Sequence, residues 1–348
     1  MKNILITGGT GYIGSHTCLE LIKKGYNLTI IDSNINSSPH SINRIKEILK
    51  RDFLENKILF FKGDIRNKSF LDEIFFKLQK ENNPIRGVIH FAGLKAVSES
   101  LSKPLLYWEN NVYGSICLFD VMKKYDCKNI VFSSSASIYR NNLLKPIFEE
   151  SEIKPCSPYG QTKLAIENIL EGIFKTSNDS WSIVNLRYFN PIGAHESGLI
   201  GENPINKPNN LFPIICRVAD GSLSQLQIYG NDWPTKDGTP IRDYIHIMDL
   251  AEAHCAGLDF LFKNKAQIIN LNVGTGIGTS VLELVNIFMK VNNCKIPYKY
   301  SEKRLGDLPF VVADNRKIKS LLEWFPKRNV EQMCKDGWNW QKSNPKGF

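Results

Sequence analysis

The 348-residue sequence lacks any apolar run long enough to cross a membrane. A membrane-spanning helix needs about 20 predominantly apolar residues, and charged or polar residues interrupt every apolar stretch well before that length. The apolar stretch at residues 4–6 is also too short for a secretory signal, and it leads directly into a glycine-rich loop. We therefore expect no membrane partner and a cytoplasmic location.

Closely spaced cysteines and runs of basic residues are missing as well. The eight cysteines are scattered, and none forms the Cys-x-x-Cys pair typical of zinc sites. They predict free thiols in a reducing compartment and no bound metal. The formal net charge is +9, but Lys and Arg occur singly or in adjacent pairs, not in runs interleaved with aromatic residues. This pattern argues against a nucleic-acid partner.

The first half of the chain alternates short β-branched runs with longer amphipathic stretches. These predict strands at residues 4–7, 28–31, 58–61, 88–91, 130–133 and 183–186, and helices at 13–24, 42–54, 70–80, 105–125 and 161–174. Such alternation is typical of an α/β fold with a Rossmann-like, doubly wound parallel sheet.

The rhythm changes after about residue 188. Residues 191–240 are rich in Pro, Gly and Asn, and helical patterns return at 249–262, 281–291 and 330–341. We expect a first domain at 1–188 that holds the sheet and a smaller, loop-rich C-terminal lobe at 189–348. Segments near residues 240–275 are expected to return to the main sheet.

A glycine-rich loop follows the first expected strand and opens the first helix. Gly8, Gly11 and Gly14 allow a tight turn, close approach of backbone N–H groups to a pyrophosphate, and close packing of helix on strand. Glycines are common in turns, so the motif alone is weak. Asp32 strengthens it, because a carboxylate at the end of the second strand accepts the ribose hydroxyls and repels a 2′-phosphate. We expect NAD, bound in the first domain.

A second glycine-rich segment, residues 274–280, does not predict another nucleotide site. Ser280 and Glu283 form a Ser-x-x-Glu capping box before an apolar run. We interpret the segment as a turn and a helix cap.

Tyr159 and Lys163 stand four residues apart, directly after Pro158. On a helix that begins there, both side chains lie on one face. Tyr-x-x-x-Lys pairs also occur by chance, but Ser135 lies upstream at the carboxyl end of an expected strand, where doubly wound sheets bind ligands. Lys163 lowers the phenol's ordinary pKa of about 10 toward neutrality. Tyr159 is then a general base whose substrate hydroxyl Ser135 orients.

With these motifs the sequence resembles the extended short-chain dehydrogenase/reductase family, and within it the UDP-glucose 4-epimerases. The resemblance runs from residue 4 to about 340 and is most specific at residues 186–191 and 237–246; residues 7–17, 63–66 and 90–97 also resemble the family. It implies an NAD site lined by Gly8, Gly11, Tyr12, Ile13, Gly14, Asp32, Asp64, Ile65, Phe91, Ala92, Gly93, Lys95, Asn110, Ser133, Tyr159, Lys163 and Phe189. It implies a UDP-hexose site lined by Lys95, Ser135, Tyr159, Asn190, Asn210, Leu211, Gln227, Ile228, Tyr229, Arg242, Arg304 and Asp307.

The resemblance also implies a reaction and an assembly. The expected reaction is the interconversion of UDP-galactose and UDP-glucose through a transient 4-keto sugar, and the expected assembly is a homodimer. Three positions depart from the family pattern: Tyr113, Arg140 and Val311. Val311 stands where many bacterial members carry a bulky Tyr, so N-acetylated UDP-hexoses are an alternative substrate.

Two other functions remain open. A nucleotide-sugar 4,6-dehydratase or decarboxylase shares the family's motifs, but a dehydratase needs a carboxylate beside the catalytic hydroxyl. Ala136 and Ser137 follow Ser135 instead. A catalytically silent NAD-sensing regulator need not retain Tyr159, Lys163 and Ser135 together.

Overall fold

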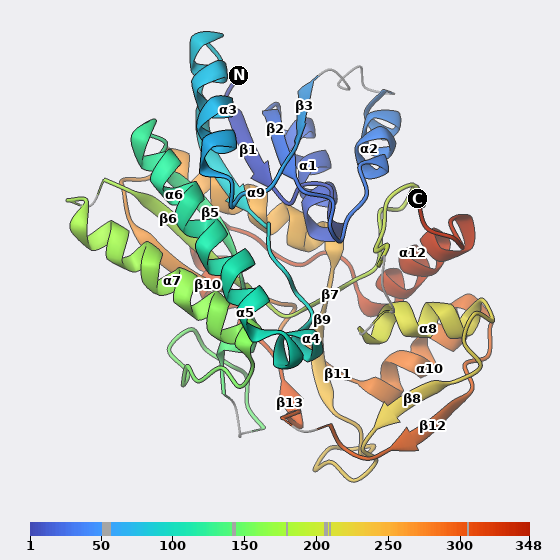
Figure 1. The fold of residues 1–348 in the computed structure, drawn as a ribbon. Helices are drawn as coiled ribbons and strands as arrows, with labels where there is room; N and C mark the ends of the chain where they lie inside the picture. Colours follow the sequence, from blue (N-terminus) through green and yellow to red (C-terminus); the bar gives the residue numbers. More distant parts are fainter. Residues whose placement is uncertain (51–56, 141–143, 179, 205–207, 209, 305) are drawn as a thin grey trace. The chain divides into compact units, whose positions relative to one another are not determined.

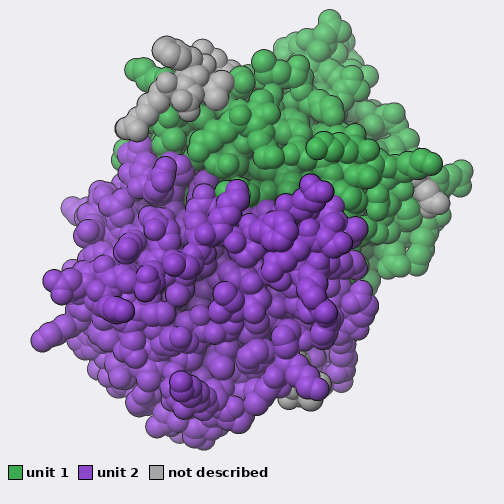
Figure 2. All heavy atoms as spheres, turned by 180° about the vertical axis from the view of Figure 1, so that it is seen from behind, with its two compact units in different colours: residues 1–138, 155–187, 251–271 green, residues 139–154, 188–250, 272–348 purple. Residues whose placement is uncertain are grey.

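The computed structural model describes residues 1–50, 57–140, 144–178, 180–204, 208, 210–304 and 306–348. They form two compact units, which Figure 2 shows in two colours. Unit 1 comprises residues 1–138, 155–187 and 251–271, and unit 2 comprises 139–154, 188–250 and 272–348. The division differs from the expected boundary in placing residues 139–154 with unit 2. Residues 251–271, in unit 1, belong to the stretch that was expected to return to the main sheet.

A seven-stranded sheet forms the centre of unit 1, in the order β10-β6-β5-β4-β1-β2-β3. The neighbouring pairs β1–β2, β2–β3, β1–β4 and β4–β5 are parallel. The expected Rossmann-like, doubly wound α/β fold is confirmed. The strands are β1 (Asn3–Thr7), β2 (Asn27–Asp32), β3 (Ile58–Lys62), β4 (Ile85–His90), β5 (Asn129–Ser135), β6 (Ser182–Tyr188) and β10 (Ile268–Val273).

Helices cover both faces of this sheet (Figure 1). One face packs its buried apolar residues against α3, α6 and α7, and Leu5, Val88 and Phe132 belong to that core. On the other face Gly87 contacts Leu258 of α9 closely. The helices with residues in unit 1 are α1 (Tyr12–Lys23), α2 (His40–Lys50), α3 (Lys68–Lys80), α4 (Val97–Ser102), α5 (Pro104–Tyr107), α6 (Gly114–Lys124), α7 (Pro158–Thr176) and α9 (Ile247–Lys263).

Most expected elements of the first half are confirmed within a few residues. The helix expected at 42–54 is α2, and its residues 51–54 lie outside the described part of the chain. The helix expected at 105–125 is divided into α5, a π-helix (Trp108–Tyr113) and α6. The sheet reverses its direction of growth between β1 and β4, and a doubly wound sheet places its ligand crevice outside such strand ends.

Unit 2 contains short strands and helices around a separate apolar core. In one sheet β9 pairs with β7, β11 and β13, and in another β8 pairs with β12. Residues of α8, α10 and α12 supply much of the core, including Phe212, Phe288 and Met333. The elements are β7 (Asn190–Ile192), α8 (Leu211–Ala219), β8 (Leu226–Tyr229), β9 (Ile241–His246), β11 (Gly278–Ser280), α10 (Val281–Asn292), β12 (Tyr298–Ser301), β13 (Phe310–Val311), α11 (Arg316–Leu322) and α12 (Val330–Ser343).

The capping box expected at Ser280 is present at the start of α10, where Ser280 Oγ accepts from Glu283 N at 3.0 Å. Among the described residues, no helix combines the length and apolar character needed to cross a bilayer.

Candidate active site

The glycine loop between β1 and α1 requires glycine on steric grounds. Gly8 adopts a φ of 71°, and a Cβ there would lie 2.7 Å from Ala92 N. A Cβ on Gly14 would lie 2.3 Å from Gly8 O. Gly11 is the N-cap of α1 and has no side chain that could accept a hydrogen bond from the N–H groups of the first turn. Tyr12 and Ile13 are the first two residues of that turn. The loop therefore forms a backbone cradle at a helix N-terminus, which suits a pyrophosphate.

Asp32 lies at the end of β2, 7% exposed, beside this cradle. Its carboxylate accepts from Thr10 N at 3.0 Å, Asn34 N at 2.9 Å and Ser37 Oγ at 2.8 Å. A carboxylate has about four lone-pair positions, so one remains for a ligand hydroxyl. Asn34 Oδ1 is buried and has no hydrogen-bond partner among the described residues. These acceptors fit the ribose of NAD.

Asp64 and Ile65 follow β3 and occupy different surroundings. Partial burial alone would raise the pKa of Asp64, but the hydrogen bonds from Arg66 lower it below its ordinary value. Arg66 Nη2 lies 2.7 Å from Asp64 Oδ2 and also pairs with Glu109. Ile65 is buried and packs closely against Gly114. The Asp64 carboxylate is thus held by protein partners.

The loop after β4 carries Phe91, Ala92, Gly93 and Lys95. Phe91 N donates to Thr7 O at 3.0 Å, and Ala92 N lies 3.3 Å from Thr7 Oγ1, so this loop adjoins the end of β1. The exposed Lys95 places Nζ 5.8 Å from the ring centroid of Tyr12. Lys95 therefore adds a positive charge near the phosphate cradle.

Asn110 and Asn111 differ in their roles in the π-helix. Asn110 Nδ2 donates to Leu106 O on its own helix at 2.8 Å. Asn111 is buried, accepts from Leu94 N at 2.8 Å and donates to Thr162 Oγ1 of α7 at 3.1 Å. Because it joins the loop after β4 to α7, Asn111 is a supporting residue that the sequence reasoning missed.

The start of α7 brings Tyr159 and Lys163 to the end of β5. Ser157 caps the helix by accepting from Gly160 N at 3.2 Å. A Cβ on Gly160 would lie 2.6 Å from Ser137 O, so a glycine is needed for α7 to approach the loop after β5. Lys163 Nζ donates to Ser133 O at 2.7 Å and lies 5.9 Å from the Tyr159 ring centroid.

Tyr159, Lys163 and Ser135 are all buried, with exposed fractions of 6%, 5% and 8%. Burial lowers the pKa of Lys163 to about 8, although Glu167 acts in the opposite direction. The ammonium form therefore predominates at neutral pH and is lost as the pH rises above about 8. Ser135 Oγ accepts from Ser137 N at 3.2 Å, and Ser137 Oγ is buried without a partner among the described residues.

A buried hydrogen-bond chain behind this site also escaped the sequence reasoning. His90 Nδ1 lies 2.6 Å from Thr7 Oγ1, and Nε2 lies 2.9 Å from Ser115 Oγ, which donates to Asn111 O. Since the Ser115 proton is directed to Asn111 O, Nε2 carries the imidazole proton. Burial, aided by the Lys163 charge, lowers the pKa of His90 to about 3. His90 is therefore neutral and structural.

Within unit 2 the structure brings several of the predicted substrate residues together. Arg242 on β9 donates to Ile241 O and Leu308 O and lies 3.4 Å from Asp307. Arg304 Cζ lies 3.8 Å from the Tyr229 ring centroid, and Tyr229 Oη donates to Gln227 Oε1 at 3.1 Å. Two cations and an aromatic ring suit a nucleoside diphosphate.

The other predicted substrate residues of unit 2 lie on different elements. Ile228 is a buried core residue of β8. Asn190 is exposed in β7, next to the buried Phe189, whose N–H donates to Val273 O at 3.1 Å. Asn210 is the N-cap of α8 and Leu211 is its first residue, and Asn210 Nδ2 lies 3.3 Å from Glu202 Oε1.

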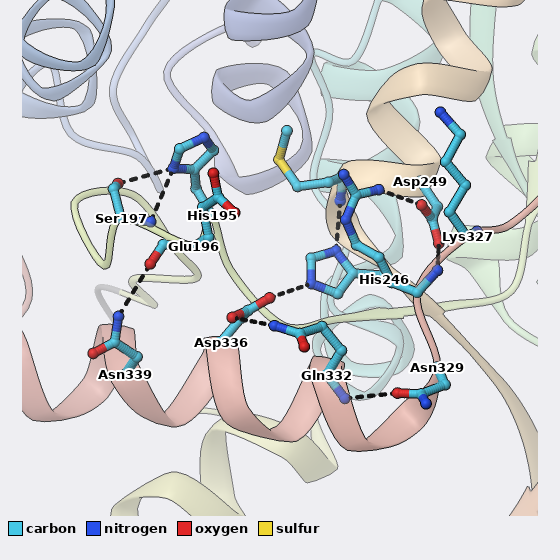
Figure 3. Close-up of polar contacts among 12 residues, drawn as sticks. His195, Glu196, Ser197, His246, Asp249, Lys327, Asn329, Gln332, Asp336 and Asn339 are labelled. Carbon is cyan, nitrogen blue, oxygen red and sulfur yellow. Dashed lines mark hydrogen bonds and ion pairs between the residues drawn. The ribbon is translucent and has the colours of Figure 1, made fainter.

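His246, which ends β9, is held in a network that Figure 3 shows. His246 Nδ1 accepts from Met248 N at 3.0 Å, which leaves Nε2 to donate to Asp336 on α12 at 3.1 Å. Asp249 pairs with Arg328 and accepts from Lys327 N. These bonds fix the turn from β9 into α9. Within the described ranges, no group of His, Cys, Asp and Glu side chains could hold a metal ion.

Comparison with known proteins then identifies the family. A family model described as GDP-mannose 4,6 dehydratase matches residues 5–337. A UDP-glucose 4-epimerase of Bacillus subtilis is 47% identical over 345 residues, covering 99% of this chain and 98% of its own. The chain belongs to the UDP-glucose 4-epimerase family. The resemblance to the extended short-chain dehydrogenases/reductases is thereby confirmed.

Two solved structures of the UDP-glucose 4-epimerase family share the whole fold. The Bifidobacterium longum enzyme, in complex with NAD+ and UDP, is 42% identical with a TM-score of 0.92, and the match covers 100% of both chains. The Stenotrophomonas maltophila enzyme, with bound NAD and a formylated UDP-arabinopyranose, is 40% identical with a TM-score of 0.93 over 99% of both chains.

Proposed function

We propose that the protein is a UDP-glucose 4-epimerase, an isomerase that interconverts UDP-galactose and UDP-glucose through a transient 4-keto sugar with NAD bound. The observation that carries the proposal is the arrangement in unit 1. There the Tyr159–Lys163 pair lies beside the Ser133–Ser135 end of β5, in the same unit as the glycine cradle. Membership of the epimerase family supports the assignment.

NAD is the cofactor, and the sterically required glycine cradle, the acceptors of Asp32 and the unpartnered Asn34 Oδ1 fit it. When bound, NAD supplies the hydride acceptor for C4 of the hexose and the donor for its return. Because the cofactor is regenerated in each cycle, it has no need to exchange. The residues proposed to hold it are those that the family resemblance implies, with Gly8, Gly11 and Gly14 at the pyrophosphate and Asp32 at the ribose.

The chain's own catalytic residues move the proton. Tyr159 removes the proton of the 4-hydroxyl and later returns it, while Ser135 hydrogen-bonds and orients the same hydroxyl. The Lys163 ammonium stabilises the phenolate by its charge, so that Tyr159 acts as a base near neutral pH. Burial of all three groups strengthens these interactions.

Residues of unit 2 hold the UDP. Arg242 and Arg304 pair with the diphosphate, and Gln227 to Tyr229, Asn190, Asn210, Leu211 and Asp307 complete the nucleotide and sugar contacts. The anchor matters because the 4-keto ring must present its other face for hydride return without escaping.

A 4,6-dehydratase is the nearest alternative, and the family model carries that description. Elimination of water needs an acid beside the catalytic hydroxyl, whereas Ala136 and Ser137 follow Ser135. The test is incubation of the pure protein with UDP-galactose and no electron acceptor. UDP-glucose alone as product supports the epimerase, and a 4-keto-6-deoxy sugar or no conversion refutes it.

Val311 favours a wider substrate range. It lies on β13 opposite Arg242 of β9 and is partly exposed, so a small side chain stands beside a proposed substrate residue. We expect turnover of UDP-N-acetylglucosamine that a Val311→Tyr variant loses while it retains UDP-glucose epimerisation. Absence of N-acetyl turnover in the parent protein refutes the larger pocket.

A homodimer is the assembly we propose, in the cytoplasm. Large apolar side chains of α4 to α6 are exposed in the single chain: Val97, Leu101, Leu105, Trp108 and Ile116. Such a patch favours burial against a second copy. All eight cysteines are free thiols, which suits a reducing compartment. Light scattering at micromolar concentration tests the dimer.

A further inference from the structure

A buried ion pair lies directly behind the catalytic pair in unit 1. Arg187, at the end of β6, places Nε 3.0 and 3.2 Å from the two carboxylate oxygens of Glu167, and Nη2 lies 2.6 Å from Oε2. The exposed side-chain fractions are 2% and 5%. Burying two charged groups costs desolvation free energy. The attraction between the two charges often does no more than balance that cost. Stability is therefore a weak reason for this pair.

The pair also grips the strand that carries the catalytic serine. Ser134 Oγ donates to Glu167 Oε1 at 2.5 Å. The neighbours of Ser134 are Ser133, whose carbonyl accepts from Lys163, and Ser135. Because successive side chains of a strand point to opposite faces, a bond at Ser134 fixes the orientation of Ser133 and Ser135. Glu167 thus connects α7, which carries Tyr159 and Lys163, to the end of β5, which carries Ser135.

The titratable and charged groups described around Lys163 lie on three elements. Helix α7 carries Glu167, one helical turn from Lys163, and the titratable Tyr159. Strand β4 carries His90, which is neutral, and β6 carries Arg187, which pairs with Glu167. Glu167 is the charge that opposes the effect of burial on Lys163. Without that carboxylate, Lys163 would lose the charge that opposes the effect of its burial, and Arg187 would lose its ion pair with α7.

We propose that Glu167 is a positioning residue for the epimerase reaction. Its buried carboxylate, held by Arg187 and Ser134, keeps the Lys163 ammonium charged and keeps the Ser133–Ser135 end of β5 aligned with Tyr159. The inference rests on the proposed function for its catalytic consequence, but its electrostatic part concerns the protein alone.

The test is Glu167→Gln, which retains the shape of the side chain and removes its charge. The pKa of Lys163 in the parent protein, about 8, is expected to fall by about one unit. A fall of one unit lowers the fraction of Lys163 ammonium about eightfold at pH 8.5 and by less than about one third at pH 6.5. We expect kcat to follow that fraction and KM for UDP-galactose to stay unchanged. NMR of side-chain-labelled lysine, assigned with Lys163→Met, reads the same pKa without turnover.

Two controls separate this role from general damage. Glu171→Gln removes a carboxylate from the next turn of α7, where it pairs with exposed Lys175 at 2.6 Å, and should change neither the pKa of Lys163 nor the pH profile. Glu167→Asp keeps the charge and should keep a Lys163 pKa near that of the parent. If Glu167→Gln does not fold, the double variant E167Q/R187Q removes both buried charges. Its Lys163 pKa should be lower than that of R187Q alone, because the two proteins differ only in the charge of Glu167.

The outcomes discriminate between the two proposals. A parent-like Lys163 pKa in folded E167Q overturns the positioning role. So does a Lys163 pKa in E167Q/R187Q that is no lower than in R187Q, and so does an equal shift in E171Q. A lowered Lys163 pKa in a protein that converts no UDP-hexose supports the electrostatic role and refutes the proposed function instead.

Discussion

Replacing Lys163 with Met removes the ammonium and keeps an unbranched stem of similar length in the buried site. At 5.9 Å, the distance of Nζ from the Tyr159 ring centroid, a unit charge contributes about 3 kcal/mol to the phenolate at an effective dielectric of about 20. That energy corresponds to about two pKa units of Tyr159. At pH 7 we therefore expect kcat to fall about 100-fold.

The pH dependence gives the sharper readout, because activity should fall with rising pH in the parent protein and rise with pH in the Lys163→Met variant. Burial lowers the pKa of Lys163 to about 8, so the parent enzyme loses its cation and its activity as the pH rises through that value. The thioether of the Lys163→Met variant has no proton to lose, and the Tyr159 base is formed by hydroxide alone. The activity of this variant should therefore rise about tenfold per pH unit from pH 7 to about 9.

The assay is initial-rate conversion of UDP-galactose between pH 6 and 9.5, with bound NAD measured in each preparation. Lys175→Met, on the exposed last turn of the same helix, makes the same chemical change and should leave the profile intact. The loss of the bond to Ser133 O should lower stability by about 1–3 kcal/mol, measured separately by denaturation. A Lys163→Met enzyme whose activity declines above pH 8 like the parent would refute the electrostatic role.

Three further changes test other parts of the structure. Gly14→Ala places a Cβ 2.3 Å from Gly8 O and should abolish NAD retention. Gly172→Ala is the control: apart from the neighbouring backbone of α7, a Cβ there meets no described atom within 4 Å, and it should stabilise α7 by about 1 kcal/mol. Equal effects of the two changes on NAD content and thermal unfolding would contradict this. Asp336→Asn weakens the bond to His246 and should cost about 1–3 kcal/mol of unfolding free energy at pH 7. Partial burial alone would raise the pKa of Asp336, but bonds from His246 and Gln332 lower it. The stability that the ionised carboxylate contributes is therefore present above about pH 4 and disappears as the pH falls. A loss of unfolding free energy in Asp336→Asn that persists at pH 2 would argue for packing instead. Arg242→Lys removes the planar fork and should raise KM for UDP-galactose at least tenfold with a smaller change in kcat, measured by steady-state kinetics; an unchanged KM places the diphosphate elsewhere.

The parallel sheet could be predicted from the sequence because each of its strands is a short run of apolar residues. Stretches with helical periodicity separate these runs. It did not predict β7, β11 and β13, which have three, three and two residues and exist because β9 offers a pairing edge. Such short strands have no periodicity to detect. The mixed composition of residues 191–240 is consistent with these brief elements and gave no indication of their pairing.

The candidate site shows the same division. Gly8, Asp32, Tyr159 and Lys163 could be proposed from the sequence because each is suited to a task that few residue types can do. Asn111 was not, because the π-helix places an extra residue in the turn and changes which Asn faces inward. The ion pair of Glu167 and Arg187 was equally hidden, since it joins a helix and a strand that only the fold brings together.

The buried charges behind the catalytic pair bear on the ionisation of Tyr159 in the proposed reaction. Lys163 and Arg187 contribute two positive charges and Glu167 one negative charge, while burial keeps His90 neutral. Among these four described side chains the sum is one positive charge in a region of low dielectric, and the Phe132 ring centroid lies 4.9 Å from Lys163 Nζ. Ionisation of Tyr159 brings that sum to zero. In the proposed site the Lys163 charge favours the phenolate form of Tyr159, and its removal should therefore make Tyr159 a weaker base at neutral pH.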